Sequence, residues 1–99
     1  MSKDENDFES RWIELQSYVE GLYDETDKLS KKAPSSATSD LATDRVNQAI
    51  RDARELLGQQ DRYVRELKEF VPAGQNPEVR DALLILREIR QALERHEPM

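Results

Sequence analysis

Residues 8–29 read FESRWIELQSYVEGLYDETDKL. Within this stretch, one set of side chains recurs at alternating spacings of four and three residues: Phe8, Trp12, Leu15, Val19, Leu22, Thr26 and Leu29. This heptad spacing puts the whole set on one face of a helix, and only Thr26 is polar. An apolar face of this kind has to pack against other helices. The pattern predicts a helix over about residues 4–32.

A breaker follows this helix at residues 33–39, which read APSSATS. Pro34 lacks the backbone N–H that a helix interior needs, so the first helix should end before it. Ser39 or Thr38 can accept a hydrogen bond from the first turn of a following helix, which is the usual role of such residues. A second helix is therefore expected over about residues 39–71.

A second breaker, VPAGQNP, occupies residues 71–77. Asn76 is a good N-cap residue, and Pro77 suits the first position of a helix, where no N–H is needed. We expect Asn76 to cap a third, shorter helix over about residues 77–96. Its inner face should consist of Val79, Ala82, Leu83, Leu86, Ile89 and Leu93.

The second helix carries a broad apolar stripe. Three neighbouring columns of residues recur at intervals of seven, and such a helix usually contacts two others. These columns are Val46, Ala53, Gln60, Leu67; Ala49, Leu56, Tyr63, Phe70; and Ile50, Leu57, Val64, Val71. Gly58 lies inside this expected helix, at a cost of about 1 kcal/mol relative to Ala.

Together these patterns predict an all-α fold in one domain, residues 1–99. We expect a three-helix bundle, made of a long antiparallel coiled-coil-like hairpin and a shorter third helix. At 1.5 Å per residue the hairpin is roughly 15–20 Å longer than the third helix. The hairpin end near residues 33–39 should then lack a covering helix.

An uncovered apolar end favours association with a second chain, either a homodimer that forms a larger bundle or a different protein. Apolar side chains at this end, and others outside the predicted faces, are candidates for the interface. They are Ile13, Leu29, Leu41, Val46, Ile50 and Leu84.

The three-helix heptad layout with a Trp in the first helix resembles spectrin-type repeats. The resemblance covers architecture only, and the third helix here is shorter than that pattern requires. It assigns no family and no function to the chain.

Composition excludes several classes of chemistry. The chain has no Cys, so disulfides, thiolate catalysis and cysteine-based zinc sites are excluded. The first residues lack the apolar segment of a secretory signal, and no apolar run approaches the roughly 20 residues of a membrane span. We therefore expect a cytoplasmic protein without a membrane contact.

Acidic charge is concentrated at the start of the chain. Residues 1–27 contain nine acidic and two basic residues, while residues 28–99 have a net charge of +1. A strongly acidic helix disfavours binding to nucleic acid. Such a helix usually serves as a solvated surface, but it is also suited to an inhibitor that imitates nucleic acid and binds a basic groove on a partner.

Catalytic and cofactor signals are missing from the sequence. His96 is the only histidine, and position 93 is Leu, so the Glu-x-x-His spacing of a helical metal site is not met. No Gly-rich phosphate loop is present. We expect no metal, no cofactor and no catalytic residues, which leaves a ligand-binding or metal-binding bundle as the weakest alternative.

The function that fits these observations best is a non-catalytic protein–protein interaction module. Such a module would act as an adaptor, an assembly subunit or a regulator of a partner. The nucleic-acid-imitating inhibitor is the second hypothesis.

Overall fold

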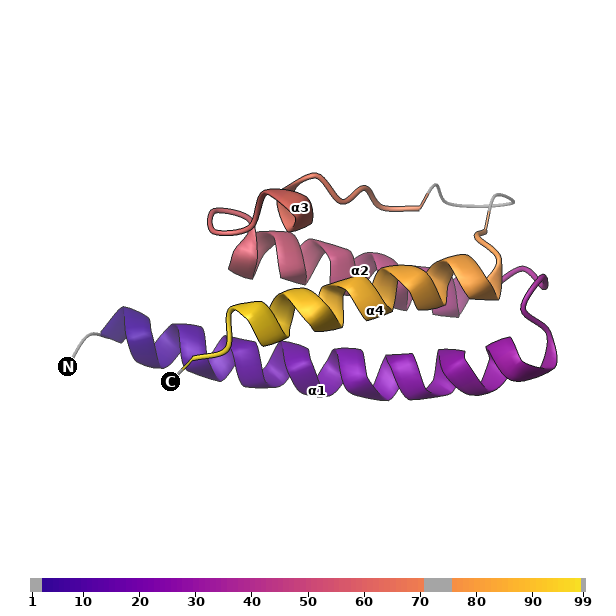
Figure 1. Cartoon of the computed structure of the whole chain (residues 1–99), viewed down its shortest axis with the longest axis horizontal. Coiled ribbons are helices and arrows are strands. Elements are labelled where there is room, and N and C mark those ends of the chain that lie inside the picture. Colours follow the sequence, from indigo (N-terminus) through magenta and orange to yellow (C-terminus); the bar gives the residue numbers. More distant parts are fainter. Residues whose placement is uncertain (1–2, 71–75, 99) are drawn as a thin grey trace.

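The computed structural model describes residues 3–70 and 76–98, with side chains from residue 7 onward. Along these residues the chain forms four helices: α1 (Lys3–Lys32), α2 (Asp40–Leu57), α3 (Arg62–Arg65) and α4 (Val79–Arg95) (Figure 1). The three long helices pack side by side into an elongated bundle of 47 × 23 × 20 Å, and the contacts of α1 with α4 are the most extensive. The prediction of an all-α bundle is confirmed.

The first and last helices agree with the sequence prediction within two residues at each end. The seam of α1 is buried from Trp12 to Thr26, whereas Leu29 is exposed. The indole N–H of Trp12 donates a 2.9 Å hydrogen bond to the Leu93 carbonyl oxygen, which joins the start of α1 to the end of α4. All six side chains of the predicted inner face of α4 are buried. Heptad spacing thus identified both faces of this antiparallel contact.

The second helix is shorter than expected, and the prediction of a helix over residues 39–71 is wrong. α2 ends at Leu57, and a turn at residues 58–60 separates it from the short helix α3. The Asp61 carboxylate accepts a hydrogen bond from the Val64 N–H at 3.2 Å and so caps a new helix start. A capping Asp bonds to the backbone of a new helix start, which competes with continuation of the preceding helix. Gly58 and Asp61 therefore mark the end of α2 and the start of α3.

The chain then returns along α2 toward residues 33–39. Residues 67–70 are not helical, and they lie beside α2 (Figure 1). A non-helical chain advances up to about 3.3 Å per residue, roughly twice the rise of a helix, so few residues bring it back. As a result, α4 begins at the linker end of the bundle, where Ala37 and Glu78 form an isolated antiparallel bridge.

This return path overturns the expectation that the linker end lacks a covering helix. The length argument assumed that the third helix starts at the opposite end of the bundle, which required an unbroken second helix. Instead, α4 begins at the linker end and packs along α2, and Val46, Ala49, Ile50 and Ala53 are buried in the core that α2 shares with α1 and α4.

Backbone hydrogen bonds fix the linker to the start of α4. The Thr38 N–H donates to the Pro77 carbonyl at 2.8 Å, and the Val79 N–H donates to the Ser36 carbonyl at 2.8 Å. Ser39 caps α2 as predicted, since its hydroxyl accepts from the Ala42 N–H at 3.1 Å.

The predicted cap of the last helix is wrong, because Glu78 occupies that position. Asn76 instead donates to the Thr38 carbonyl at 2.9 Å and to the Asp40 carboxylate at 2.8 Å. Its amide therefore ties the return segment to the linker. Residues 71–75 of the predicted breaker lie outside the described residues.

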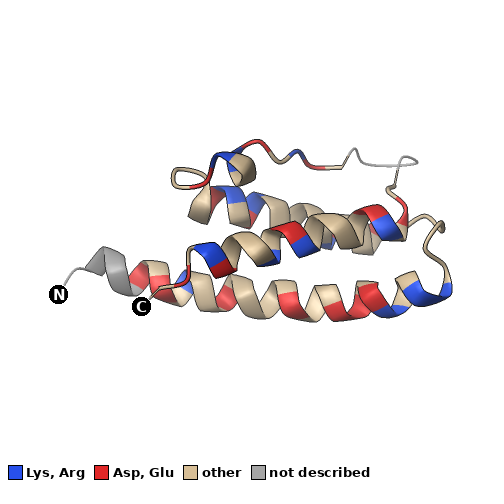
Figure 2. Cartoon of the chain, in the orientation of Figure 1, with Lys and Arg blue, Asp and Glu red and all other residues tan. Residues whose placement is uncertain are grey.

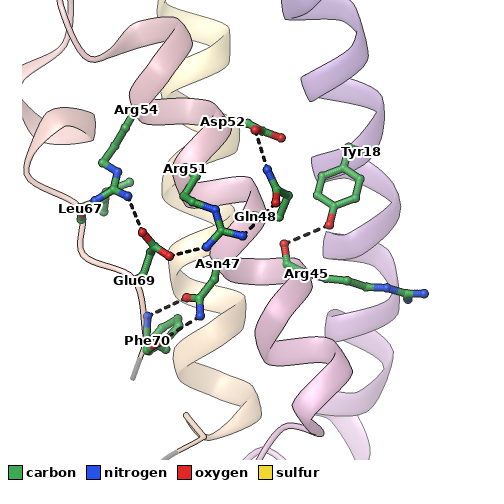
Figure 3. Close-up of polar contacts among 10 residues, drawn as sticks. All are labelled: Tyr18, Arg45, Asn47, Gln48, Arg51, Asp52, Arg54, Leu67, Glu69 and Phe70. Atoms are coloured by element: carbon green, nitrogen blue, oxygen red, sulfur yellow. Dashed lines mark hydrogen bonds and ion pairs between the residues drawn. The ribbon is translucent and has the colours of Figure 1, made fainter. Parts of the chain in front are cut away.

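A polar stripe on α2 holds the returning chain (Figure 3). The Asn47 side chain accepts from the Phe70 N–H at 2.7 Å and donates to the Phe70 carbonyl at 3.0 Å. Arg54 donates to the Leu67 carbonyl at 3.1 Å. Arg51 and Arg54 both pair with Glu69 and lower the pKa of its carboxyl. Residues 47, 51 and 54 share one face of α2, so their side chains hold residues 67–70 against that face.

Candidate functional site

The predicted interface residues fall into two groups. Four of them are about half exposed or more, namely Ile13 (50%), Leu29 (52%), Leu41 (61%) and Leu84 (50%). The structure corrects the prediction for the other two, because Val46 and Ile50 are 1% and 0% exposed in the core of their own chain. Their burial follows from the position of α4 over the linker end.

The exposed residues do not form one continuous patch. Because Trp12 contacts Leu93, its neighbour Ile13 lies level with the last turns of α4. Leu84 lies nine residues before Leu93, which is about 13 Å along the helix axis. Ile13 and Leu84 therefore do not form a joint apolar patch on the described surface.

Two predicted residues, the exposed Leu29 and the buried Val46, line a pocket with a volume of about 350 Å³ at the linker end. We call this cavity the linker pocket. Its walls come from the last turns of α1, the linker, the first turns of α2 and the start of α4. The lining residues are Thr26, Leu29, Lys32, Ala33, Ser36, Ala37, Thr38, Ser39, Ala42, Val46, Val79 and Ala82. Most of the exposed lining is apolar, so the pocket is suited to an apolar group.

Small residues explain why this space stays open. Ala33, Ala37, Ala42 and Ala82 supply only methyl groups, and the remaining wall includes capping Ser and Thr residues. The walls are held by hydrogen bonds: the Thr38 and Thr43 hydroxyls are 2.7 Å apart, and the Thr43 hydroxyl also donates to the Ser39 carbonyl at 3.0 Å. The pocket is thus a preformed feature of the fold.

The end of α1 beside the linker pocket is basic, and Lys32 is the one charged residue among those that line the pocket. Residues 28–39, KLSKKAPSSATS, contain three lysines and no acidic residue. Lys31 pairs with Asp27 at 3.3 Å, whereas Lys28 and Lys32 form no ion pair with any residue that the structure describes. Figure 2 shows this basic end of α1 next to the uncharged linker.

The rest of α1 is acidic (Figure 2). Three of its carboxylates are engaged: Glu20 pairs with Arg90 at 2.8 Å, Glu25 with Arg45 at 3.8 Å, and Asp27 with Lys31. Other acidic residues are exposed to solvent, namely Asp7, Glu9, Glu14 and Asp24. These four lie on the part of α1 that faces away from the core.

A polar cluster at the opposite end of the bundle was not anticipated. Asp61 is 8% exposed and accepts hydrogen bonds from Arg95 at 2.8 Å and from the Val64 N–H, and it lies 3.1 Å from His96 Nε2. Burial raises the pKa of the Asp61 carboxyl, but these donors outweigh burial and lower the pKa to about 2. Because its oxygens already accept these hydrogen bonds, the Asp61 carboxylate is suited to holding α3 against α4 rather than to proton transfer.

Tyr63 makes a second link across the same end, because its hydroxyl donates to the Glu88 carboxylate. This hydrogen bond and burial raise the pKa of Tyr63 to about 12. The phenol therefore stays protonated and keeps donating across the neutral range, which again joins α3 to α4.

Among residues 3–70 and 76–98, no three His, Cys, Asp or Glu side chains lie close enough together to bind a metal ion. None of the described helices combines the length and hydrophobicity of a membrane crossing. Comparison of the chain with protein-family models, with curated proteins and with solved structures finds no match.

Sequence reasoning identified Leu29 and Val46 but missed the pocket that they line. The pocket combines residues from four segments, and only the path of the return segment brings Val79 and Ala82 to the linker. A signal was nevertheless present in the sequence, because KLSKKAPSSATS combines lysines with small side chains and lacks acids. Such a segment at a helix junction indicates a basic surface with little side-chain bulk.

Proposed function

We propose that the chain is a non-catalytic protein–protein interaction module, an adaptor, assembly subunit or regulator, that holds a partner at the linker pocket. The observation that carries this proposal is the open apolar pocket beside the half-exposed Leu29. Partner proteins commonly anchor an interface with a few large apolar side chains in such pockets.

The pocket can hold one large apolar side chain of a partner, which is only a small part of an interface. Burying one large apolar side chain contributes about 1.5–3 kcal/mol, which alone gives weak binding. A partner would need further contacts around the rim, and Leu29 and the lysines of residues 28–32 provide them. This fits a transient partner better than a permanent one.

Site-specific photo-crosslinking in the native host tests the proposal. A photoreactive phenylalanine analogue replaces Ser36, which is exposed and lines the pocket, and a matched control replaces Ser17, which is exposed on the outward face of α1. We expect a defined protein adduct from position 36 and none from position 17. The absence of any adduct at position 36, or equal yields at both positions, would contradict the proposal.

Self-association is the special case in which a second copy supplies the anchor. Light scattering of the purified chain over a range of concentrations separates this case from a different partner. A mass near twice 11.5 kDa that falls in a Ser36→Trp variant would support a homodimer through the pocket. A mass of 11.5 kDa at every concentration would leave a different protein as the partner.

A second candidate function is the acidic inhibitor that imitates nucleic acid. It is favoured by the exposed carboxylates of α1, which are not neutralised by ion pairs with described residues, in particular Glu9, Glu14 and Asp24. The same crosslinking experiment decides between the two. An adduct from position 17 that disappears when Glu14 and Asp24 are changed to Gln and Asn would support this second function.

A further inference from the structure

We propose that the occupant of the linker pocket is a second copy of this chain, which inserts its Leu41 there while its own pocket receives Leu41 in return. This inference rests on the proposed function and names the partner at the same site. It comes from two exposed leucines beside the pocket and from the mixed charge of the linker end.

Leu29 and Leu41 lie at the same level of the bundle, beside the pocket. Glu25 of α1 pairs with Arg45 of α2 at 3.8 Å, and the two helices run in opposite directions (Figure 1). Leu29 follows Glu25 by one turn and Leu41 precedes Arg45 by one turn, so both leucines lie one turn closer to the linker than this ion pair. Leu29 lines the pocket, and Leu41 directly precedes Ala42, which lines it too.

The fold of the chain itself makes little use of either leucine. Leu29 is 52% exposed, and Leu41, at 61%, is the most exposed large apolar residue in the described part of the chain. Each copy therefore offers an unoccupied apolar pocket and an unburied apolar anchor at the same end. In an isologous dimer one two-fold axis can bring each anchor to the pocket of the other copy, so a single surface serves both roles.

The volume of the pocket is suited to this anchor. An apolar protein cavity of about 150 Å³ holds one benzene molecule. A volume of about 350 Å³ therefore accommodates the side chain of one Leu, but not a whole helix. Insertion would cover apolar carbon of both the anchor and the pocket walls, which drives association.

Unpaired charges of both signs surround the pocket. Lys28 and Lys32 form no ion pair with any described residue, and several exposed carboxylates at this end form none either. These carboxylates are Asp24, Asp40, Asp44 and Asp81. A partner with charge of one sign would be attracted by some of these groups and repelled by the others. A second copy carries the same mixture, so lysines of each copy can lie opposite carboxylates of the other.

The net charge of −6 on each copy does not prevent this contact. Most of the excess acid is in residues 1–27, and the carboxylates up to Glu20 lie at least about 13 Å from Leu29 along the axis of α1. At physiological salt, exposed charges are screened beyond about 8 Å. Contact through the linker ends therefore keeps the acidic parts of the two copies apart.

The dimer formed in this way is weak. Only the last turn of α1, the linker and the first turn of α2 take part, whereas stable interfaces bury about 1,200–2,000 Å². We expect a dissociation constant on the order of 100 µM. The monomer and the dimer then exchange with concentration, as suits a transient contact.

Sedimentation equilibrium of the full chain, from about 10 µM to about 1 mM, tests the inference on four proteins. They are the wild type, Leu41→Ser, which removes the anchor, Ala42→Leu, which fills the pocket, and Leu84→Ser. Leu84→Ser is the matched control, because Leu84 is 50% exposed and does not line the pocket. Amide spectra by NMR show whether each variant is folded.

An equimolar mixture of Leu41→Ser and Ala42→Leu is the decisive sample. In either variant alone, neither of the two anchor contacts can form. In the mixture, the Ala42→Leu copy still carries Leu41 and the Leu41→Ser copy still has an open pocket, so one contact can form between them. A merely structural effect of the substitutions would not be repaired by mixing.

We expect the dimer of the wild type to be weakened at least about 10-fold in Leu41→Ser and in Ala42→Leu, and to be unchanged in Leu84→Ser. The mixture should associate more strongly than either variant alone. The photoreactive residue at position 36 should then yield an adduct of two copies of the chain.

Other outcomes overturn the inference in distinguishable ways. A monomer at every concentration would refute it. An adduct of position 36 with a different protein would then leave the proposed function standing, whereas no adduct would refute both. A dimer that ignores Leu41→Ser and Ala42→Leu, or that is not restored in the mixture, would place the interface elsewhere. A lipid or other small molecule retained in native mass spectrometry, and lost in Ala42→Leu, would assign the pocket to a different occupant.

Discussion

Replacing Asn47 by Ala tests whether the return segment is held as the structure indicates. The Asn47 side chain is 7% exposed and makes two hydrogen bonds with the backbone of Phe70, of 2.7 and 3.0 Å. Each hydrogen bond contributes about 1 kcal/mol net, and the half-buried Phe70 groups left behind lose their partners. Ala is the better helix former by about 0.5 kcal/mol, which offsets part of this loss. We expect the free energy of unfolding to fall by about 2 kcal/mol.

Urea denaturation followed by Trp12 fluorescence measures this change, and hydrogen exchange reports on the Phe70 amide directly. The matched control is Gln48→Ala, because Gln48 is the exposed neighbour and bonds only to the side chains of Asp52 and Arg51. We expect the control to change the stability by less than about 0.5 kcal/mol. Protection of the Phe70 amide should be lost only in the Asn47 variant.

Replacing Asn47 by Asp distinguishes the contributions of the two hydrogen bonds, because it removes only one of them. The carboxylate still accepts from the Phe70 N–H, but it cannot donate to the Phe70 carbonyl and repels that oxygen. We expect Asn47→Asp to be at least as destabilising as Asn47→Ala at neutral pH, with partial recovery relative to wild type as the new carboxyl is protonated. If Asn47→Ala costs less than about 0.5 kcal/mol, the return path along α2 is not held in this way, and the placement of α4 has to be reconsidered.

Two further substitutions test the break between α2 and α3. A Cβ at position 58 would overlap the Arg54 carbonyl oxygen, so Gly58→Ala should destabilise the fold by about 1 kcal/mol in urea denaturation, whereas a continuous helix would be stabilised by a similar amount. Asp61 has its pKa lowered to about 2, so it adds stability above about pH 4 that is lost as the pH falls toward 2. Asp61→Asn should cost about 1–2 kcal/mol near pH 7, allowing for the half-exposed Arg95, and the gap to wild type should close near pH 2. A gap that is independent of pH would contradict this assignment.

Periodic apolar patterns predicted two of the three long helices closely. The faces of α1 and α4 are continuous over many turns, and α1 ends just before Pro34. Burial of an unbroken stripe leaves little choice of structure, so spacing alone was sufficient. The same reasoning failed for α2, where the apolar columns continue through Gly58 into α3 and residues 67–70.

The failure has a physical cause. Val64 and Leu67 are buried as the columns predict, but they reach the core from a short helix and a non-helical segment. Heptad spacing predicts which side chains are buried. It does not predict whether the backbone between them forms one continuous helix. Gly58 was noted in the sequence, but a single Gly is a weak signal for a helix break. Asn47, Arg51 and Arg54 gain their structural role only from their hydrogen bonds to residues 67–70.

The candidate site depended on this tertiary arrangement even more. Leu29 and Leu41 were expected to be exposed because they lay at an end without a third helix, and they are exposed although α4 covers that end. The expectation therefore identified the surface from a wrong premise. Val46 and Ile50 show the difference, because they were expected at the same uncovered end but are buried in the core where α2 packs against α1 and α4.

Replacing Ala42 by Leu tests whether the linker pocket is kept open at the expense of stability. Ala42 is half-buried on the pocket wall, and a Leu there would place additional carbon atoms in open apolar space. Leu is nearly as good a helix former as Ala, and partial burial of its side chain should raise the free energy of unfolding by about 1 kcal/mol. If Ala42→Leu stabilises the fold but abolishes partner binding, the open space at position 42 serves binding rather than stability, as expected for a functional cavity. Urea denaturation gives the answer, with Ser17→Leu as a control that adds the same side chain on an open surface of α1. A loss of stability in Ala42→Leu would mean that the pocket walls are already in contact in solution, and the proposed anchor would then have no space to bind.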